Sequence, residues 1–264
     1  MYNLILADLY SLRKSLTLKV LFVASLLCAS VMTYISNLVT QGKIGIEISG
    51  IGSFFTDVHM TALLGSVVAA VYIVNDFETK TIHDAISSGS SRSMLVISKT
   101  FVYFFIIALI VLPYSIVINM AIITDNMLSP VLPSAFLNIM ANEPHLTYTA
   151  ALFVKMMVIT LTIMIVYASQ LSFCVLIAFV LRKKVLVIMI GYAIMFISGQ
   201  LIALRDKYSI LDTILSYTPY GVSFSQFVID AEAGVFIKAI VISVLFSVLM
   251  IAITYVSFRK SEIK

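Results

Sequence analysis

The sequence predicts an all-α membrane protein with six transmembrane helices, and two observations carry that prediction. Hydrophobic residues make up 61% of the 264 residues and charged residues only 11%, whereas soluble domains carry about a quarter charged residues. The apolar residues also occur in runs of roughly 20, the length that crosses a hydrocarbon core as a helix. An ordinary soluble globular protein is therefore excluded.

Residues 1–15 are expected to form an amphipathic helix on the membrane surface, because apolar side chains recur there at spacings of three and four. These are Tyr2, Ile5, Leu6, Leu9, Leu12 and Leu16. A signal peptide is the alternative, since Arg13 and Lys14 precede an apolar run. That run is too long for a typical signal sequence, and no clear small-residue cleavage site follows it.

Six spans are expected within one transmembrane domain that covers 1–264. Arg182, Lys183 and Lys184 interrupt an otherwise apolar stretch between the fourth and fifth spans. Each such charge costs about 2.5–3.5 kcal/mol at a helix centre, so three together cost on the order of 8–10 kcal/mol and force the chain out of the bilayer. The resulting spans are 16–36, 58–75, 94–118, 156–181, 185–204 and 235–257.

The basic residues give the expected orientation. Twelve of the 17 Lys and Arg residues fall on the side that holds the N-terminus. Because basic residues are retained on the inner side, both termini are expected in the cytosol of a bacterium, with the chain in its cytoplasmic (inner) membrane. The net charge of +4 is spread over helix ends and short loops, which suits anionic lipid headgroups and not nucleic acid. Of the outer connections, 205–234 is too apolar for a free loop and is expected to hold short interfacial or re-entrant helices.

Several kinds of chemistry find no support in the sequence. There is no G-x-x-x-x-G-K-[ST] phosphate loop and no H-E-x-x-H zinc motif. His59, His83 and His145 fall in three separate segments, and Cys28 and Cys174 are expected to be packing residues, so no metal site is predicted. All thirteen carboxylates lie outside the cores of the predicted spans, which argues against transport driven by a proton or sodium gradient.

The segment 76–92, between spans two and three, carries helix-capping signals. Asn75 and Glu78 fit a capping box, Gly89 suits a left-handed C-terminal cap, and Ser90 or Ser91 can cap the next helix. The two interpretations are a short capped helix or a plain connecting loop. A helix would present one partly apolar face, made by Phe77, Ile82, Ala85 and Ile86.

The pattern Asp-Phe-Glu-x-x-Thr-Ile-x-x-x-Ile-Ser-x-Gly-x-Ser-Arg begins at Asp76 and is followed by Lys99. It resembles the hairpin between the second and third spans of type-2 ABC export permeases, although Lys80 stands where that family usually has Gly. The resemblance extends over nearly the whole chain: the N-terminal helix, the six-span layout, Tyr217-x-Pro219 and the basic tail that ends in Lys260. Only the hairpin is specific. Small bacterial permeases for lantibiotics, other peptides or bacitracin are the most similar group.

The resemblance implies the membrane-spanning subunit of an ATP-driven exporter of hydrophobic or amphipathic molecules, such as peptides or antimicrobials. This chain would be no enzyme and would bind no cofactor; ATP and Mg²⁺ would bind two copies of a separate ABC-type ATPase. A second permease chain would complete a homodimer or heterodimer, closed mainly by spans two and five. The residues coupled to the ATPase would be Phe77, Glu78, Thr81, Ile82, Ile86 and Arg92, with the apolar face as the docking surface.

Uncharged polar residues in the spans are candidates for a cargo path: Thr61, Ser66, Ser198 and Gln200, with Ser169 and Gln170 also facing the core. The alternative is interhelical hydrogen bonding, worth about 0.6 kcal/mol per bond. Two other functions stay open, an immunity or sensing complex that removes peptide from the membrane and a non-transport membrane scaffold.

Overall fold

The computed structural model describes residues 2–45, 49–124, 128, 130, 132–139, 149–222 and 224–261, and all regular structure in them is helical. His145 lies outside the described residues. Six helices in the described part are long and apolar enough to cross a membrane, which supports a membrane protein. They are α2 (Leu16–Thr40), the continuous helix Asp57–Glu78, α7 (Arg92–Ile123), α9 (Ala150–Leu181), α10 (Lys184–Ala203) and α12 (Ala233–Lys260).

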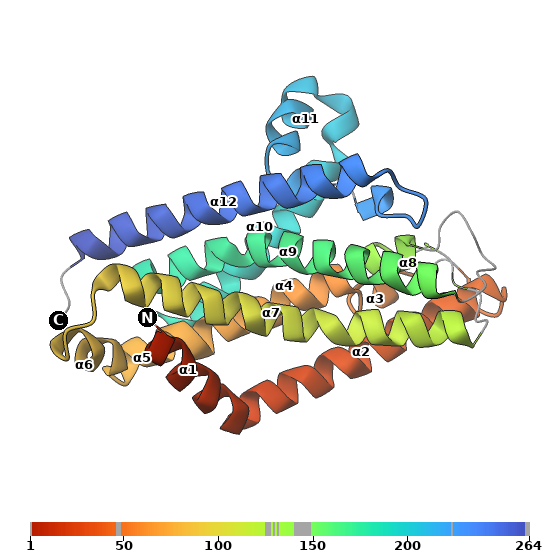
Figure 1. Cartoon of the computed structure of the whole chain (residues 1–264). Helices are drawn as coiled ribbons and strands as arrows, with labels where there is room; N and C mark the ends of the chain where they lie inside the picture. The colour runs from red at the N-terminus through yellow and green to blue at the C-terminus, as the bar shows by residue number, and fades with distance from the viewer. Residues whose placement is uncertain are drawn as a thin grey trace.

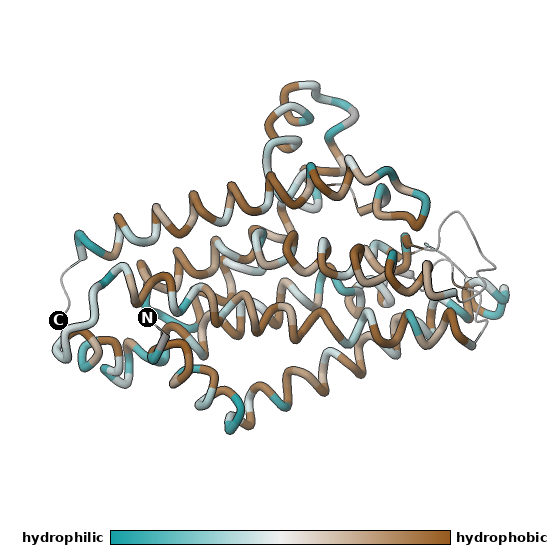
Figure 2. The backbone as a smooth tube through the Cα atoms, viewed as in Figure 1, coloured by the Kyte–Doolittle hydropathy of each residue, from teal (hydrophilic) through white to brown (hydrophobic). Residues whose placement is uncertain are grey.

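These six helices confirm the expected all-α fold, and each predicted span overlaps one of them. Helix is the form that apolar segments take in lipid, because it satisfies every main-chain hydrogen bond within the segment. Side-chain caps mark two of the starts: Ser91 accepts from the N–H of Met94 at α7, and Thr149 accepts from the N–H of Leu152 at α9. Figure 2 shows apolar residues along the lengths of the helices and polar residues mainly at their ends.

The second spanning helix consists of three consecutive parts. It begins as α4 (Asp57–Val68), continues as a π-helical stretch, η2 (Ala69–Val74), and ends as α5 (Asn75–Glu78). Short π-helical stretches within α-helices occur frequently at functional sites. This one leads directly into α5 and the following helix α6 (Thr81–Ser87), which together form the hairpin before α7.

The long helices lie side by side along one axis (Figure 1). Helix α9 is the most buried of the six and packs extensively on α12, while α7 packs on both α2 and α9. Helix α10 packs on α4 and α9, and at Gly191 its main chain lies close to Ser66 of α4 and Cys174 of α9. A Cβ at that position would lie 2.5 Å from Ser66 Oγ and 2.8 Å from Cys174 Sγ, so the close contact requires a glycine.

The two ends of the bundle differ. The hairpin end holds α5, α6, the turn at Arg182 and the last residues of α12, and α1 (Tyr2–Lys14) lies beside it at an angle to α2 (Figure 1). The loop end holds α3 (Ser49–Ser53) and α8 (Ala135–Asn138). Within segment 205–234, the described residues form short helical elements before α12 begins. They are η3 (Arg205–Lys207), α11 (Ser209–Ser216), η4 (Pro219–Gly221) and η5 (Phe224–Gln226).

Candidate functional site

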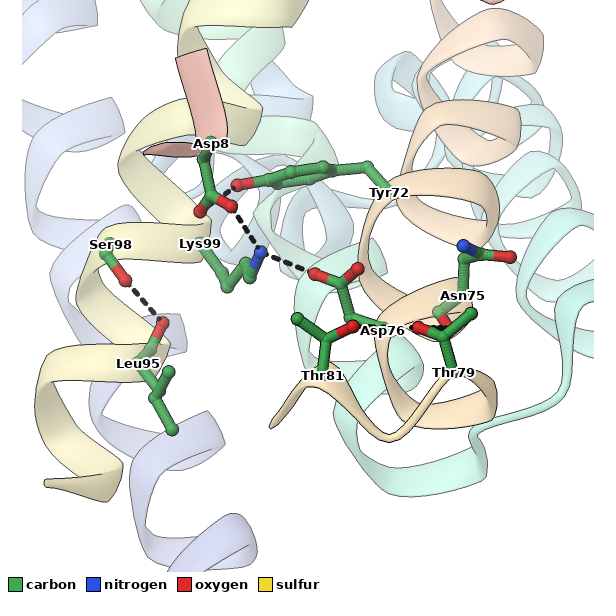
Figure 3. A network of polar contacts seen from close by, with 9 residues as sticks. All are labelled: Asp8, Tyr72, Asn75, Asp76, Thr79, Thr81, Leu95, Ser98 and Lys99. Carbon is green, nitrogen blue, oxygen red and sulfur yellow. Dashed lines mark hydrogen bonds and ion pairs between the residues drawn. The ribbon is translucent and has the colours of Figure 1, made fainter. Parts of the chain in front are cut away.

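A buried ion network lies at the hairpin end and joins α1, the second spanning helix and α7 (Figure 3). Lys99 of α7 pairs with Asp8 of α1 at 2.8 Å and with Asp76 of α5 at 2.5 Å. The Tyr72 hydroxyl, from η2, donates a hydrogen bond of 2.8 Å to the second oxygen of Asp8. The Lys99 ammonium also lies 4.6 Å from the centre of the Tyr72 ring.

This network fixes the position of the hairpin relative to α1 and α7. The Lys99 side chain is only 7% exposed and each carboxylate is 20% exposed, so the charges are largely withdrawn from water. Charges in such a place need good pairing geometry, because an unpaired buried ion is strongly destabilising. Lys99 therefore holds α1 and α5 against α7, so that a movement of any one of these helices is transmitted to the other two.

An aromatic cluster packs the base of the hairpin against two other spanning helices. The Phe77 ring makes edge contacts with Phe179 of α9 and Phe258 of α12, at centroid distances of 5.5 and 6.0 Å. The rings of Phe179 and Phe258 are 5.1 Å apart. The Arg182 guanidinium lies 4.8 Å from the centre of the Phe77 ring, an arrangement in which a cation is attracted to the aromatic face.

Two arginines tie the end of α12 to this cluster. Arg92 donates hydrogen bonds to the carbonyl oxygens of Phe258, Arg259 and Ser261, at 2.8–3.1 Å. These carbonyls belong to the last turn of the helix and the residue after it, where a cation is favoured by the negative end of the helix dipole. Arg182 donates to the Ser261 hydroxyl at 2.8 Å. Burial and the neighbouring Arg92 both lower the pKa of Arg182 from its ordinary value.

A third connection links the hairpin to α10. Lys184 pairs with Glu78 at 2.6 Å and donates to the side-chain oxygen of Asn75 at 2.9 Å. The predicted capping box at Asn75 and Glu78 is therefore wrong. The helix runs through Asn75 without a break, so there is no free helix start to cap, and both side chains bind Lys184 instead.

The main chain of the hairpin turns at two left-handed residues. Gly89 has φ of 95°, its N–H donates to the carbonyl of Ile86, and the next N–H, of Ser90, donates to Ala85, so the predicted C-terminal cap is present. The expected single helix is instead interrupted at Lys80, where φ is 60° and ψ is 10°. Lys80 occupies the position at which the resembled family usually has Gly.

The structure separates the predicted coupling residues into two groups. Phe77 and Ile82 are buried inside this chain, with 8% and 1% of their surface exposed. Phe77 and Ile82 therefore do not form an external docking surface, because Phe77 packs on α9 and α12 of the same chain and Ile82 belongs to its buried core. Glu78 and Thr81 are exposed, and Ile86 and Arg92 are half-buried.

The candidate path residues differ in exposure. Thr61 and Ser66 are fully buried, and Ser66 donates to the carbonyl of Ala62 within its own helix. Gln200 lies exposed on α10, and Ser198 is half-buried there and donates to Met195. Ser169 and Gln170 make interhelical hydrogen bonds to the carbonyls of Ser243 and Pro219, the alternative already named for them.

Asp57 is a residue whose environment the sequence did not reveal. It was expected at the polar end of a span, yet it is completely buried where α4 begins. One of its carboxylate oxygens accepts from the Tyr167 hydroxyl at 2.5 Å and from the N–H of Ala135 at 3.1 Å. Asp57 therefore joins α4, α8 and α9 at the loop end.

The sequence also did not predict the ion-pair partners of Lys99. Asp76 and Lys99 both belonged to the quoted hairpin pattern, but nothing in their spacing showed that they pair with each other and with Asp8. Within the described part of the chain, no three His, Cys, Asp or Glu side chains are grouped so that they could hold a metal ion.

No protein-family model matches this chain, and no curated protein sequence matches it.

Proposed function

We propose that this protein is the membrane-spanning subunit of an ATP-driven exporter of the type-2 ABC class, and that the α5–α6 hairpin couples it to a separate ATPase. One observation carries the proposal: the hairpin exposes a polar face while its base is fastened to most of the spanning helices. An element that transmits force must be held at both sides, since a loosely attached loop would absorb the movement.

The fastening has three parts. Lys99 joins the hairpin to α1 and α7, Lys184 joins it to α10, and the ring of Phe77 packs against α9 and α12. A displacement of the hairpin would therefore be transmitted directly to those helices. The buried Phe77 and Ile82 act in this proposal as internal supports and not as the contact surface.

The contact surface in this proposal is polar. The exposed residues of the hairpin are Glu78, Thr79, Lys80, Thr81, Asp84, Ser87, Ser88, Gly89 and Ser91. Such a surface suits a soluble partner that is bound through hydrogen bonds and charge pairs, which contribute more to specificity and association rate than to raw affinity.

The conformation of Lys80 adds support for the resemblance. Glycine adopts a left-handed main chain at no steric cost, whereas other residues pay about 1–2 kcal/mol. A family that usually has Gly before Thr-Ile and a chain that turns left-handed at Lys80 agree on the same main-chain geometry. In this proposal the departure in sequence at Lys80 changes the residue and keeps the turn.

In this proposal the hairpin end faces the cytosol of a bacterium, in keeping with the distribution of Lys and Arg. Helix α1 then lies as an interfacial helix at the inner surface of the cytoplasmic membrane, with exposed Leu6 and Tyr10 toward lipid. The ATPase would contribute ATP and Mg²⁺, and two copies would serve two permease chains.

The second permease chain would meet α10, whose apolar residues are mostly exposed, and not α4, which is largely covered within this chain. Ser198 and Gln200 on α10 would then line a path between the two chains. A path without fixed charge suits a hydrophobic or amphipathic cargo, such as a peptide or antimicrobial.

The test is to purify the tagged chain from its native membranes in mild detergent and to determine the composition of the complex by native mass spectrometry. The proposal predicts two permease chains and two nucleotide-binding subunits. A chain recovered without any nucleotide-binding subunit would support a non-transport scaffold. An immunity or sensing complex would contain the same subunits but would fail to move cargo across proteoliposomes.

A further inference from the structure

A cavity of about 270 Å³ lies between the α1–α2 corner and the second spanning helix, next to the Lys99 network. One part of its wall is polar and is made by Asp8, Ser11, Ser15, Tyr72, Asn75 and Asp76. The other part is apolar and includes Leu18, Leu21, Val68, Val71 and Ile106. The cavity is therefore amphipathic, with both carboxylates in its polar wall.

The charges around this cavity are not balanced. Lys99 is shared between Asp8 and Asp76, so the three side chains together carry one net negative charge. Lys99 does not line the cavity, whereas both carboxylates do. None of the other basic residues at this corner lines the cavity: Lys184 pairs with Glu78, Lys14 lies over the Tyr10 ring, and Arg13 and Lys19 are exposed outside it.

We propose that this cavity binds the ammonium head of an amphipathic molecule whose apolar tail lies along α2. A cation beside Asp8 and Asp76 would neutralise the unbalanced charge, and a largely buried carboxylate gains most from a partner that brings its own hydrogen-bond donors. A small hydrated ion would fit this cavity less well than an amphipathic ammonium. The ion would leave the side chains of Leu18, Leu21 and Val71 without an apolar partner.

The size of the cavity and its surroundings fit this class of ligand. Pockets that enclose a whole drug-sized molecule measure about 300–1,000 Å³, so this one suits a headgroup and the first carbons of a chain. Beyond the cavity, α2 exposes Phe22 and Leu26, which follow Leu18 at spacings of four and continue the apolar surface along which the remaining tail can lie. The ligand would reach the site from the bilayer and not from bulk water.

The chain contains no tryptophan, which permits a site-specific optical test. Phe22→Trp places a single fluorophore beside Leu21, at the apolar side of the cavity. The full chain is reconstituted in vesicles of phosphatidylglycerol, without any other protein, and titrated with 12-bromododecylammonium, whose bromine quenches tryptophan. The proposal predicts saturable quenching, and 12-bromododecanoate should give only the linear quenching of bilayer partitioning.

Three variants in the Phe22→Trp background separate the site from general partitioning. Asp76→Asn should raise the half-saturating concentration about tenfold or more, since it removes one partner of a desolvated charge pair. Val71→Phe keeps every charge but fills the cavity, and it should abolish the saturable component. Asp230→Asn removes an exposed carboxylate at the loop end and should change half-saturation by less than about twofold.

The source of the ligand is decided in a second series, with brominated phosphatidylethanolamine or brominated phosphatidylglycerol in the vesicle. Stronger quenching by the ethanolamine lipid, together with loss of alkylammonium saturation, identifies a lipid headgroup as the occupant. Saturation by alkylammonium alone identifies a free cationic amphipath. Equal linear quenching by ammonium and carboxylate probes, or saturable quenching that survives Val71→Phe, overturns the proposal.

Discussion

Lys99 of α7 and Asp76 of α5 form an ion pair of 2.5 Å that is largely hidden from water. Because Lys99 also binds Asp8, one buried side chain positions both the N-terminal helix and the hairpin. The hairpin end of the molecule is organised around this contact.

Replacing Lys99 should therefore lower the free energy of unfolding. Lys99→Met would leave two carboxylates close together without a cation, and we expect a loss of about 3 kcal/mol in the free energy of unfolding. Unfolding in mixtures of SDS and mild detergent measures this. Asp8→Asn and Asp76→Asn, added to Lys99→Met, should restore much of the loss. The control is Lys43→Met at the exposed loop end; equal effects of the two lysine changes would contradict the account.

Lys80→Gly should stabilise the chain, by about 0.5–1 kcal/mol. Removing the left-handed strain gains about 1–2 kcal/mol, and the greater freedom of glycine in the unfolded chain offsets part of it. Lys80→Ala keeps the strain and should be nearly silent. Lys183→Gly is the matched control, because its φ of −127° needs no glycine and the change should destabilise. The same unfolding assay decides between them, and a destabilised Lys80→Gly chain would count against the left-handed turn.

Phe77→Ala should lower the free energy of unfolding. It leaves a gap beside the Phe179 and Phe258 rings and removes the ring beneath Arg182, so we expect a loss of about 3 kcal/mol in the free energy of unfolding. Phe54→Ala removes a ring that is 57% exposed and should cost far less. If the unfolding free energies of the two variants are the same, Phe77 is not the internal support described above.

The proposed orientation is open to single-cysteine labelling in a Cys28→Ser, Cys174→Ser background. An impermeant maleimide added to intact cells should label Lys207→Cys but should label Lys183→Cys only after lysis. Both positions are exposed, so access to the side chain is not in question. Labelling of Lys183→Cys in intact cells would place the hairpin end outside and would reverse the orientation.

The sequence was sufficient for the helices because their signal is local. Runs of about 20 apolar residues, broken by the three charges at Arg182–Lys184, define the spanning helices without reference to tertiary contacts. The caps at Gly89 and Ser91 were likewise visible, since each depends on neighbouring residues.

The site was harder to predict because it depends on contacts between distant segments. Phe77 has the same apolar character whether it faces an ATPase or packs on Phe179 and Phe258, and periodicity alone cannot separate the two. Asp57 resembled an ordinary interfacial carboxylate until Tyr167 and the start of α8 were seen to enclose it. The left-handed turn at Lys80 had no local signal, since lysine does not favour it.

The central claim is that the polar face of the hairpin binds an ATPase, and charge reversal on that face tests it most directly. Asp84→Lys changes an exposed side chain that lies away from the buried supports, and its place in the first turn of α6 limits the expected folding cost to about 1 kcal/mol. The tagged variant is purified from native membranes beside wild-type and Asp230→Lys at the loop end. We predict that Asp84→Lys recovers about tenfold less nucleotide-binding subunit per permease chain, while Asp230→Lys recovers the wild-type amount. Equal recovery of that subunit by all three chains, or its absence from the wild-type complex, would contradict the claim.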